Sequence, residues 1–163
     1  TFADVSARDA GFDGIVHVGG DLRVDRLLQS HGQLEVDASI RAGLFQSDGR
    51  FEVSGDIDAP RVDATLRGTS RVGTIRADEV RLKLPARPPI LRSIGGSASL
   101  DIDRIEAKSV VIEGVTVQYV RADRIVVGRQ CHVVRYDGTV VSCHPSSHLG
   151  PESRSPPPPG MSR

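Results

Sequence analysis

Apolar and polar residues alternate along most of the chain, in short runs separated by Gly, Asp, Ser or Pro. Leu22-Arg23-Val24 and Leu34-Glu35-Val36 are typical. A period of two is that of a β-strand, in which successive side chains point to opposite faces. The pattern therefore predicts many short strands and excludes helices as the main element.

Two stretches of the sequence repeat each other. The ten residues LLQSHGQLEV, which begin at Leu27, return as LFQSDGRFEV from Leu44, 17 positions later. A shorter phrase, an aliphatic residue followed two positions later by Ala, recurs at intervals of 17, 18, 30 and 15 residues. We interpret the interval of 30 as two coils of about 15, one of them distorted by PARPPILRSIGG at residues 85–96. The phrase begins at Ile40, Ile57, Ile75, Ile105 and Val120.

A repeat of 15 to 18 residues is too short for the common helical repeats, which span about 33 residues or more. Short strands that cannot each bury a face alone do so when they are wound into coils and stacked in register. The sequence predicts an all-β, single-domain parallel β-solenoid of about seven coils at residues 14–141. Residues 1–13 are expected to be irregular, and residues 142–163, rich in Pro and Ser, to be a disordered tail.

The aliphatic positions of the repeat define a predicted core in which each coil lies over the next. Outer positions one coil apart mostly carry opposite charges, such as Arg61 over Glu79 and Glu106 over Arg121, which supports the register. The predicted stacked core consists of Leu27, Leu34, Val36, Ile40, Leu44, Phe51, Val53, Ile57, Val62, Ile75, Val80, Leu82, Ile105, Val110, Ile112, Val120, Ile125 and Val127.

Composition narrows the possible partners and the compartment. Lysine plus arginine and aspartate plus glutamate both number 21, so no strong field attracts nucleic acid or anionic lipid. No apolar run approaches the 18 or so residues of a membrane helix, and no signal peptide is recognisable. With only two cysteines, we expect a cytoplasmic protein with neither nucleic-acid binding nor a direct membrane span.

The stretch IEAKSVVIEGVTVQYVRADRIVVGRQCHVV, residues 105–134, resembles the bactofilin family of polymer-forming cytoskeletal proteins. The resemblance covers about residues 14–134 and implies a right-handed β-helix that polymerises end to end without nucleotide. It also implies a bacterial scaffold for cell shape whose partners are itself and proteins of the cell envelope or cell wall, peripheral to the inner membrane. The interruption at residues 85–96 departs from the even coils of the family. No membrane-targeting segment is recognisable before Gly14.

The open ends of a solenoid favour self-assembly independently of any family, because unpaired strand edges template pairing with another chain. We expect polymerisation through a first rim and a last rim. The alternative at the last rim is that YDGT, residues 136–139, forms a hairpin that covers it. The predicted interface consists of Ile15, Val16, Val18, Leu22 and Val24 at the first rim and Val133, Val134, Tyr136, Val140 and Val141 at the last.

Cys131, His132, Cys143 and His144 are the only cluster of metal-ligand side chains. A hairpin would place His132 across from Cys143 and Cys131 across from His144. Zinc needs four converging ligands, whereas adjacent strand residues point to opposite faces, so the four would split into two pairs. We therefore predict no metal site, a buried apolar role for Cys131, and no cofactor.

Enzymatic activity is not expected either. His17 and His31 stand alone on polar positions, and no glycine-rich phosphate motif follows a strand. The left-handed hexapeptide acyltransferases are the enzyme class to weigh, but their strict six-residue phrase is absent. Two alternatives to a polymerising scaffold stay open: a solenoid that binds a partner without polymerising, and a trimeric acyltransferase-like enzyme.

Overall fold

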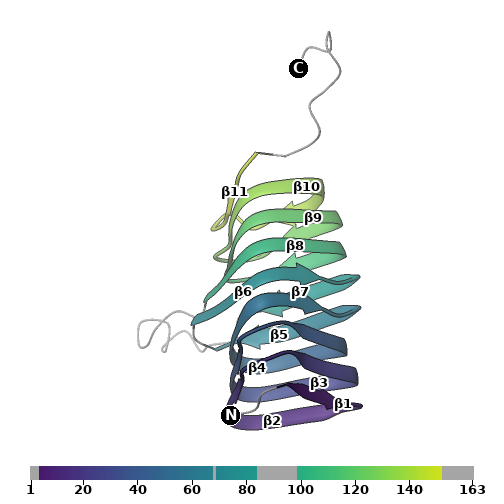
Figure 1. Ribbon diagram of the computed structural model, residues 1–163. Helices are drawn as coiled ribbons and strands as arrows, with labels where there is room; N and C mark the ends of the chain where they lie inside the picture. The colour runs from purple at the N-terminus through teal and green to yellow at the C-terminus, as the bar shows by residue number, and fades with distance from the viewer. Residues whose placement is uncertain (1–3, 68, 84–98, 152–163) are drawn as a thin grey trace.

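The computed structural model describes residues 4–67, 69–83 and 99–151. Along these residues every regular element is a strand, and the strands pair in parallel to form a β-solenoid of about eight turns. Figure 1 shows the coils stacked into a rod, with β1 and β2 at one end and β10 and β11 at the other. The strands are β1 (Val5–Ala7), β2 (Ala10–Val18), β3 (Leu22–Val36), β4 (Ile40–Asp58), β5 (Arg61–Leu66), β6 (Thr69–Arg76), β7 (Glu79–Lys83), β8 (Ser99–Ile112), β9 (Val115–Val127), β10 (His132–Cys143) and β11 (His148–Leu149).

The register of the strands is continuous from one end of the rod to the other. Leu34 pairs with Phe51, as the repeat predicts. Columns of residues that occupy the same position in successive coils can be followed through every coil. One runs Phe12, Ser30, Ser47, Ala64, Leu82, Ile112, Val127, Cys143. Another runs Val18, Val36, Val53, Val72, Ile102, Val117, Val133, Leu149.

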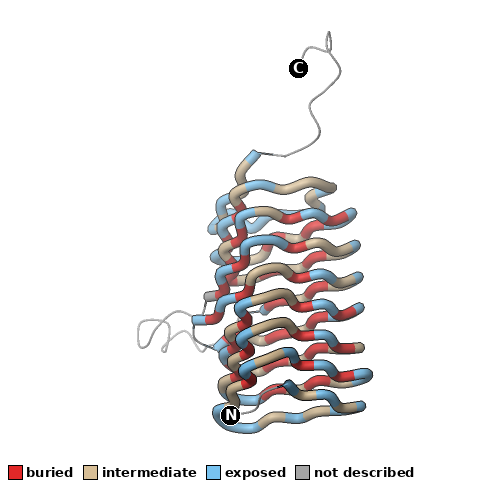
Figure 2. The backbone as a smooth tube through the Cα atoms, in the orientation of Figure 1, coloured by how far each residue is buried: buried red, intermediate tan, exposed pale blue. Residues whose placement is uncertain are grey.

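The core lies along the axis of the rod, where Figure 2 shows the buried positions of successive coils in line. The predicted core residues are buried, with two exceptions. Leu27 and Leu44 are only partly buried, and their neighbours Leu28 and Phe45 are 0% exposed. The register shifts between Val24 and Leu27, and this shift decides which of two adjacent apolar residues faces inward.

The solenoid extends beyond the predicted limits at both ends. Residues predicted to be irregular form β1 and the start of β2, which pair with β3. At the other end, residues 142–143 belong to β10 and residues 148–149 form β11. The rod therefore has about eight coils rather than about seven. The rest of the predicted tail, from residue 152, lies outside the described residues.

The sequence suggested that the 30-residue interval between Ile75 and Ile105 is two coils, and the structure contradicts this. Ile75 pairs directly with Ile105, and Val80 pairs with Val110, so the two residues of each pair lie in adjacent coils. β7 thus ends at Lys83 and β8 begins at Ser99, and the two strands pair in the register of adjacent coils. The proline-containing stretch at residues 85–96 lies outside the described residues.

The predicted alternation of charges follows the observed register, although few of these pairs make contact. Arg61 and Glu79 pair in register, and their side chains lie 3.8 Å apart. Glu106 pairs in register with Arg121, but its carboxylate contacts Arg104 at 2.7 Å and Arg76 at 3.5 Å. Exposed pairs of this kind contribute at most about 1 kcal/mol each, so burial of the aliphatic columns is the main source of stability.

Candidate functional site

The two ends of the rod are the places where apolar side chains remain incompletely covered. Nearly all of the partly buried hydrophobic residues that pack against the core belong to the first or the last coil. We call those of the first coil the N-terminal end face and those of the last coil the C-terminal end face. The N-terminal end face consists of Val5, Ala10, Phe12 and Val16, and the C-terminal end face of Tyr136, Val140 and Leu149.

The N-terminal end face is formed by β1 and β2. Both strands pair with β3 on one side, and no described strand pairs with them on the other. Phe12 and Val16 occupy inward-facing columns that continue above them with Ser30 and Leu34. Their other side lacks the next coil, which explains their partial exposure. This edge carries backbone N–H and C=O groups that another parallel strand would satisfy.

The C-terminal end face is formed by β10 and β11. β11 pairs with His132 and Val133 only, and so completes the last coil rather than covering β10. Within the described chain, no strand pairs with the outer edge of residues 135–143. Tyr136 and Val140 continue the columns of Val120 and Ile125. This face is therefore open in the same way as the first.

The predicted interface residues divide into three groups. Val18, Leu22, Val24 and Val133 are buried, at most 3% exposed. β1 pairs with Leu22 and Val24 and β11 pairs with Val133, so these three residues are not at a rim. Val18 lies in β2, whose outer edge pairs with no described strand. Val16, Tyr136 and Val140 do belong to the end faces. Ile15, at 80% exposed, and Val141, at 50%, lie in the end coils but face outward, while Val134 is half-buried.

Three end-face residues of the first coil were missed by sequence reasoning, namely Val5, Ala10 and Phe12. The segment that contains them has small residues at inward positions, so its hydrophobic alternation is weak. A signal existed in the alternation of Ala10, Phe12, Val16 and Val18 on either side of Gly14. Leu149, also missed, lies in a segment assigned to the tail.

The hairpin considered as an alternative at residues 136–139 does not form. β10 runs through Asp137 and Thr139 as one strand parallel to β9. Gly138 has φ +140°, and a Cβ atom there would collide with the carbonyl oxygen of Ala122 in the coil beneath. This glycine therefore permits close stacking of two coils at a corner instead of a reversal of the chain.

The cysteines and histidines near the C-terminal end face lie in different positions from those that a hairpin predicted. His132 pairs with His148, and their rings stack with centroids 4.8 Å apart, while Cys143 pairs with Val127. Cys131 is buried, as predicted, and its thiol donates to the carbonyl oxygen of Ile112. Burial is the main reason that the pKa of the Cys131 thiol is raised. Within the described ranges, no three His, Cys, Asp or Glu side chains are grouped to hold a metal.

The sequence suggested that His17 and His31 stand alone, but the structure places an aspartate beside each of them. The His17 Nε2 atom lies 3.0 Å from Asp37 Oδ1, and the His31 Nδ1 atom lies 3.5 Å from Asp13 Oδ1. Both rings are on the outer surface. Neither is hydrogen-bonded to a hydroxyl or thiol group in the described part of the chain.

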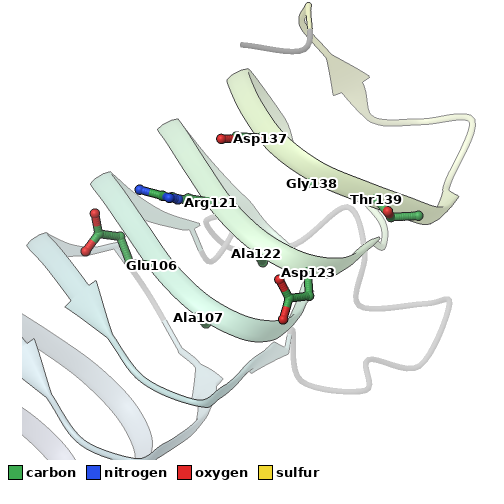
Figure 3. A pocket seen from close by; sticks show the side chains of 8 residues that line it. All are labelled: Glu106, Ala107, Arg121, Ala122, Asp123, Asp137, Gly138 and Thr139. Atoms are coloured by element: carbon green, nitrogen blue, oxygen red, sulfur yellow. The ribbon is translucent and has the colours of Figure 1, made fainter. Parts of the chain in front are cut away.

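A shallow groove of about 630 Å³ lies at a corner of the last three coils. Figure 3 shows Ala107, Ala122 and Gly138 in line along β8, β9 and β10, with charged side chains on either side. Glu106, Asp123 and Asp137 contribute carboxylates, and Arg121 contributes the one cation among the lining residues. The lining residues include no histidine, cysteine or lysine. The groove ends at the C-terminal end face.

No family model, curated protein sequence or solved structure matches the chain. In the described residues, no helix has the length and apolar character required to cross a bilayer.

Proposed function

We propose that this protein is a non-enzymatic scaffold that assembles end to end into filaments without nucleotide. In this proposal it is a bacterial cytoskeletal element that positions partner proteins at the cell envelope, the role that the resemblance to bactofilins implies. The single observation that carries the proposal is the presence of open, apolar strand edges at both ends of the rod.

The energetics favour association of such ends. Burying a Val, Leu or Phe side chain completely contributes about 1.5–3 kcal/mol, and each end face offers several that are half-buried. Strands of a second copy would in addition satisfy backbone groups along β10 and β2. Because the ends are formed by paired strands rather than by loops, we expect little loss of conformational entropy on association.

The first test is the size of the purified protein as a function of its concentration, without nucleotide. Negative-stain microscopy with size-exclusion chromatography should show rods that lengthen as concentration rises. A discrete trimer at every concentration would favour the acyltransferase-like alternative. A monomer at every concentration would favour a binding module and contradict the proposal.

The second test places a charge in an end face and, separately, beside it. Val140→Asp should abolish the polymer, because the carboxylate would be buried in the joint between copies. Val141→Asp is the matched control, since Val141 faces outward, and it should polymerise normally. Val16→Asp and Ile15→Asp form the corresponding pair at the N-terminal end face. Circular dichroism of all four variants should match that of the unmodified protein, and a polymer unchanged in both end-face variants would refute the proposal.

A further inference from the structure

We infer that His132 and His148 form a binding site for a divalent transition-metal ion, with zinc as the representative ion. Each histidine would supply one imidazole nitrogen as a ligand, and water would supply the other ligands. The ion would tie β11 to β10 at the C-terminal end of the rod. The inference concerns the outer surface of one copy and does not depend on the proposed assembly.

The two imidazole rings lie against each other on the outer surface. His132 of β10 and His148 of β11 are partners in a parallel strand pair, and both are exposed. Their ring centroids are 4.8 Å apart, and the ring planes are inclined by 17°. Figure 1 shows both strands at the C-terminal end of the rod. Both rings are therefore accessible to an ion from solvent.

The nitrogens of these two rings have no other partner in the described part of the chain. The chain contains five histidines, and no hydrogen bond or ion pair between described residues involves the ring of His132 or His148. A neutral imidazole has one nitrogen with a free lone pair, and this is the form that binds metals. In the other three histidines a ring nitrogen lies close to an aspartate or a serine. These pairs are His17 with Asp37, His31 with Asp13 and His144 with Ser146.

The backbone places the two histidines side by side before any ion binds. The His148 N–H donates a hydrogen bond to the Cys131 carbonyl oxygen at 2.9 Å. The Gly150 N–H donates one to the Val133 carbonyl oxygen at 2.7 Å, and the Leu149 side chain packs against the core. These contacts hold the Cα atoms of the pair one strand spacing apart, about 4.8 Å. Ligands that are already adjacent lower the entropy cost of binding an ion.

A zinc ion can bridge two rings at this separation. Zinc–imidazole bonds are about 2.0–2.1 Å long, so the two nitrogens in a tetrahedral site lie about 3.3 Å apart. Each ring can bring one nitrogen to that separation by turning about its side-chain torsions, because both side chains are exposed. Imidazole is a ligand for zinc, copper and nickel, whereas calcium and magnesium prefer oxygen ligands. The pair therefore selects the transition-metal class.

The number of protein ligands decides what kind of site this is. Among the described residues, no third His, Cys, Asp or Glu is grouped with this pair to hold a metal. The residue beneath His132 in the same column is Thr116. Structural zinc sites have four protein ligands, so we expect the ion at this site to exchange with solvent. β11 pairs with β10 through His132 and Val133 only, and an ion bound across the histidines would reinforce this short contact.

Isothermal titration with zinc chloride, on the full chain without an affinity tag, tests the site. The unmodified protein should bind one ion per chain. His132→Ala and His148→Ala should each weaken binding at least about tenfold, because each removes one of the two ligands. His31→Ala, which removes an exposed histidine near the N-terminal end of the rod, is the matched control and should leave binding unchanged. Absence of binding, or binding that either ligand variant keeps, would overturn the inference. One ion per two chains would place the ion between copies and would overturn it as well.

Amide hydrogen exchange tests separately whether the ion ties the two strands together. Zinc at ten times its dissociation constant should slow exchange of the His148 and Gly150 amides about tenfold, because the ion binds only while β10 and β11 are paired. The Gly55 amide, which donates to the Ala38 carbonyl oxygen far from this end, is the control and should not change. His148→Ala should abolish the slowing at Gly150 while its circular dichroism matches that of the unmodified protein. Exchange at Gly150 that saturating zinc leaves unchanged would overturn the inference.

Discussion

The first coils and the last coils of the rod differ in width. Leu28 pairs with Phe45, 17 residues later, whereas Val110 pairs with Ile125, 15 residues later. The difference arises at two corners, each shorter by one residue in the later coils. The corner between Val36 and Ile40 corresponds to that between Ile102 and Ile105, and the corner between Ser30 and Leu34 to that between Ile112 and Val115. We call coils up to residue 66 the wide half and those from residue 99 the tight half.

The interior of each half matches its width. The four phenylalanines of the chain all lie at or before residue 51. Phe45 and Phe51 fill the wide half edge to face, with ring centroids 5.6 Å apart. Three serines are buried in or next to the wide half, whereas the buried side chains of the tight half are aliphatic apart from Cys131. Corner length therefore selects side-chain volume, and the following changes test this relation.

The largest expected effect is the loss of a buried ring. Phe51→Ala should lower the free energy of unfolding by about 4 kcal/mol, because the side chain is 0% exposed and its removal leaves a cavity. Val115→Ala, at the equivalent inward position of the tight half, should cost about 2 kcal/mol. Urea titration followed by circular dichroism measures both. Equal losses would contradict a difference in width between the halves.

The glycine corner of the wide half should be nearly as sensitive. Gly32 has φ +110°, and a Cβ atom there would collide with the carbonyl oxygen of Gly14. Gly32→Ala should therefore cost about 3 kcal/mol in the same titration. Gly11→Ala is the control, since its Cβ atom would meet nothing within 4 Å, and it should change stability by less than about 0.5 kcal/mol. A tolerated alanine at position 32 would show that the corner does not need glycine.

Removing the hydroxyl of a buried serine should change stability less than the changes above. The effect should also differ between Ser70 and Ser47. The Ser70 hydroxyl accepts a hydrogen bond from the Phe51 backbone N–H at 3.0 Å, so Ser70→Ala should cost about 1–2 kcal/mol. The Ser47 hydroxyl is buried without a partner among the described residues. Ser47→Ala should therefore be neutral or slightly stabilising. Thermal denaturation of both variants checks this expectation. A larger loss of stability for Ser47→Ala than for Ser70→Ala would contradict it.

The smallest effect concerns the thiols of the tight half. Iodoacetamide should label the exposed Cys143 about a hundredfold faster than the buried Cys131. The raised pKa of Cys131 stabilises the fold below pH 9.0, the ordinary value for the unfolded thiol. That contribution should be lost as pH rises further, because the unfolded chain ionises first. Mass spectrometry of the labelled protein measures the rates at which iodoacetamide labels the two thiols. Equal rates for both thiols in the folded protein would contradict the burial of Cys131.

The sequence predicted most of the fold because its repeats have strand periodicity and a nearly constant length. The choice between Leu27 and Leu28 was wrong, although counting back by twos from Leu34 leads to Leu28. The polar Ser30 at an inward position concealed that pattern. The 30-residue interval was wrong for another reason. Length alone does not distinguish two coils from one coil with an insertion, whereas pairing of Ile75 with Ile105 does.

The candidate site was less predictable than the fold. Which residues form an end depends on where the first and last coils lie, and these coils have the weakest hydrophobic alternation. Val5 and Ala10 become part of a coil only through pairing with β3. Leu22 and Val24 were assigned to the rim because the coil beneath them was not recognised.

The direction of the backbone hydrogen bonds has a mechanical consequence. They join one coil to the next and therefore lie along the length of the rod. A pulling force applied at the two ends acts on every contact between successive coils in series. The rod therefore yields at the weakest of these contacts, because the load is not shared among them. A force applied across the rod acts along the covalent strands instead. The molecule is thus stiff against transverse load and gives way in steps under tension.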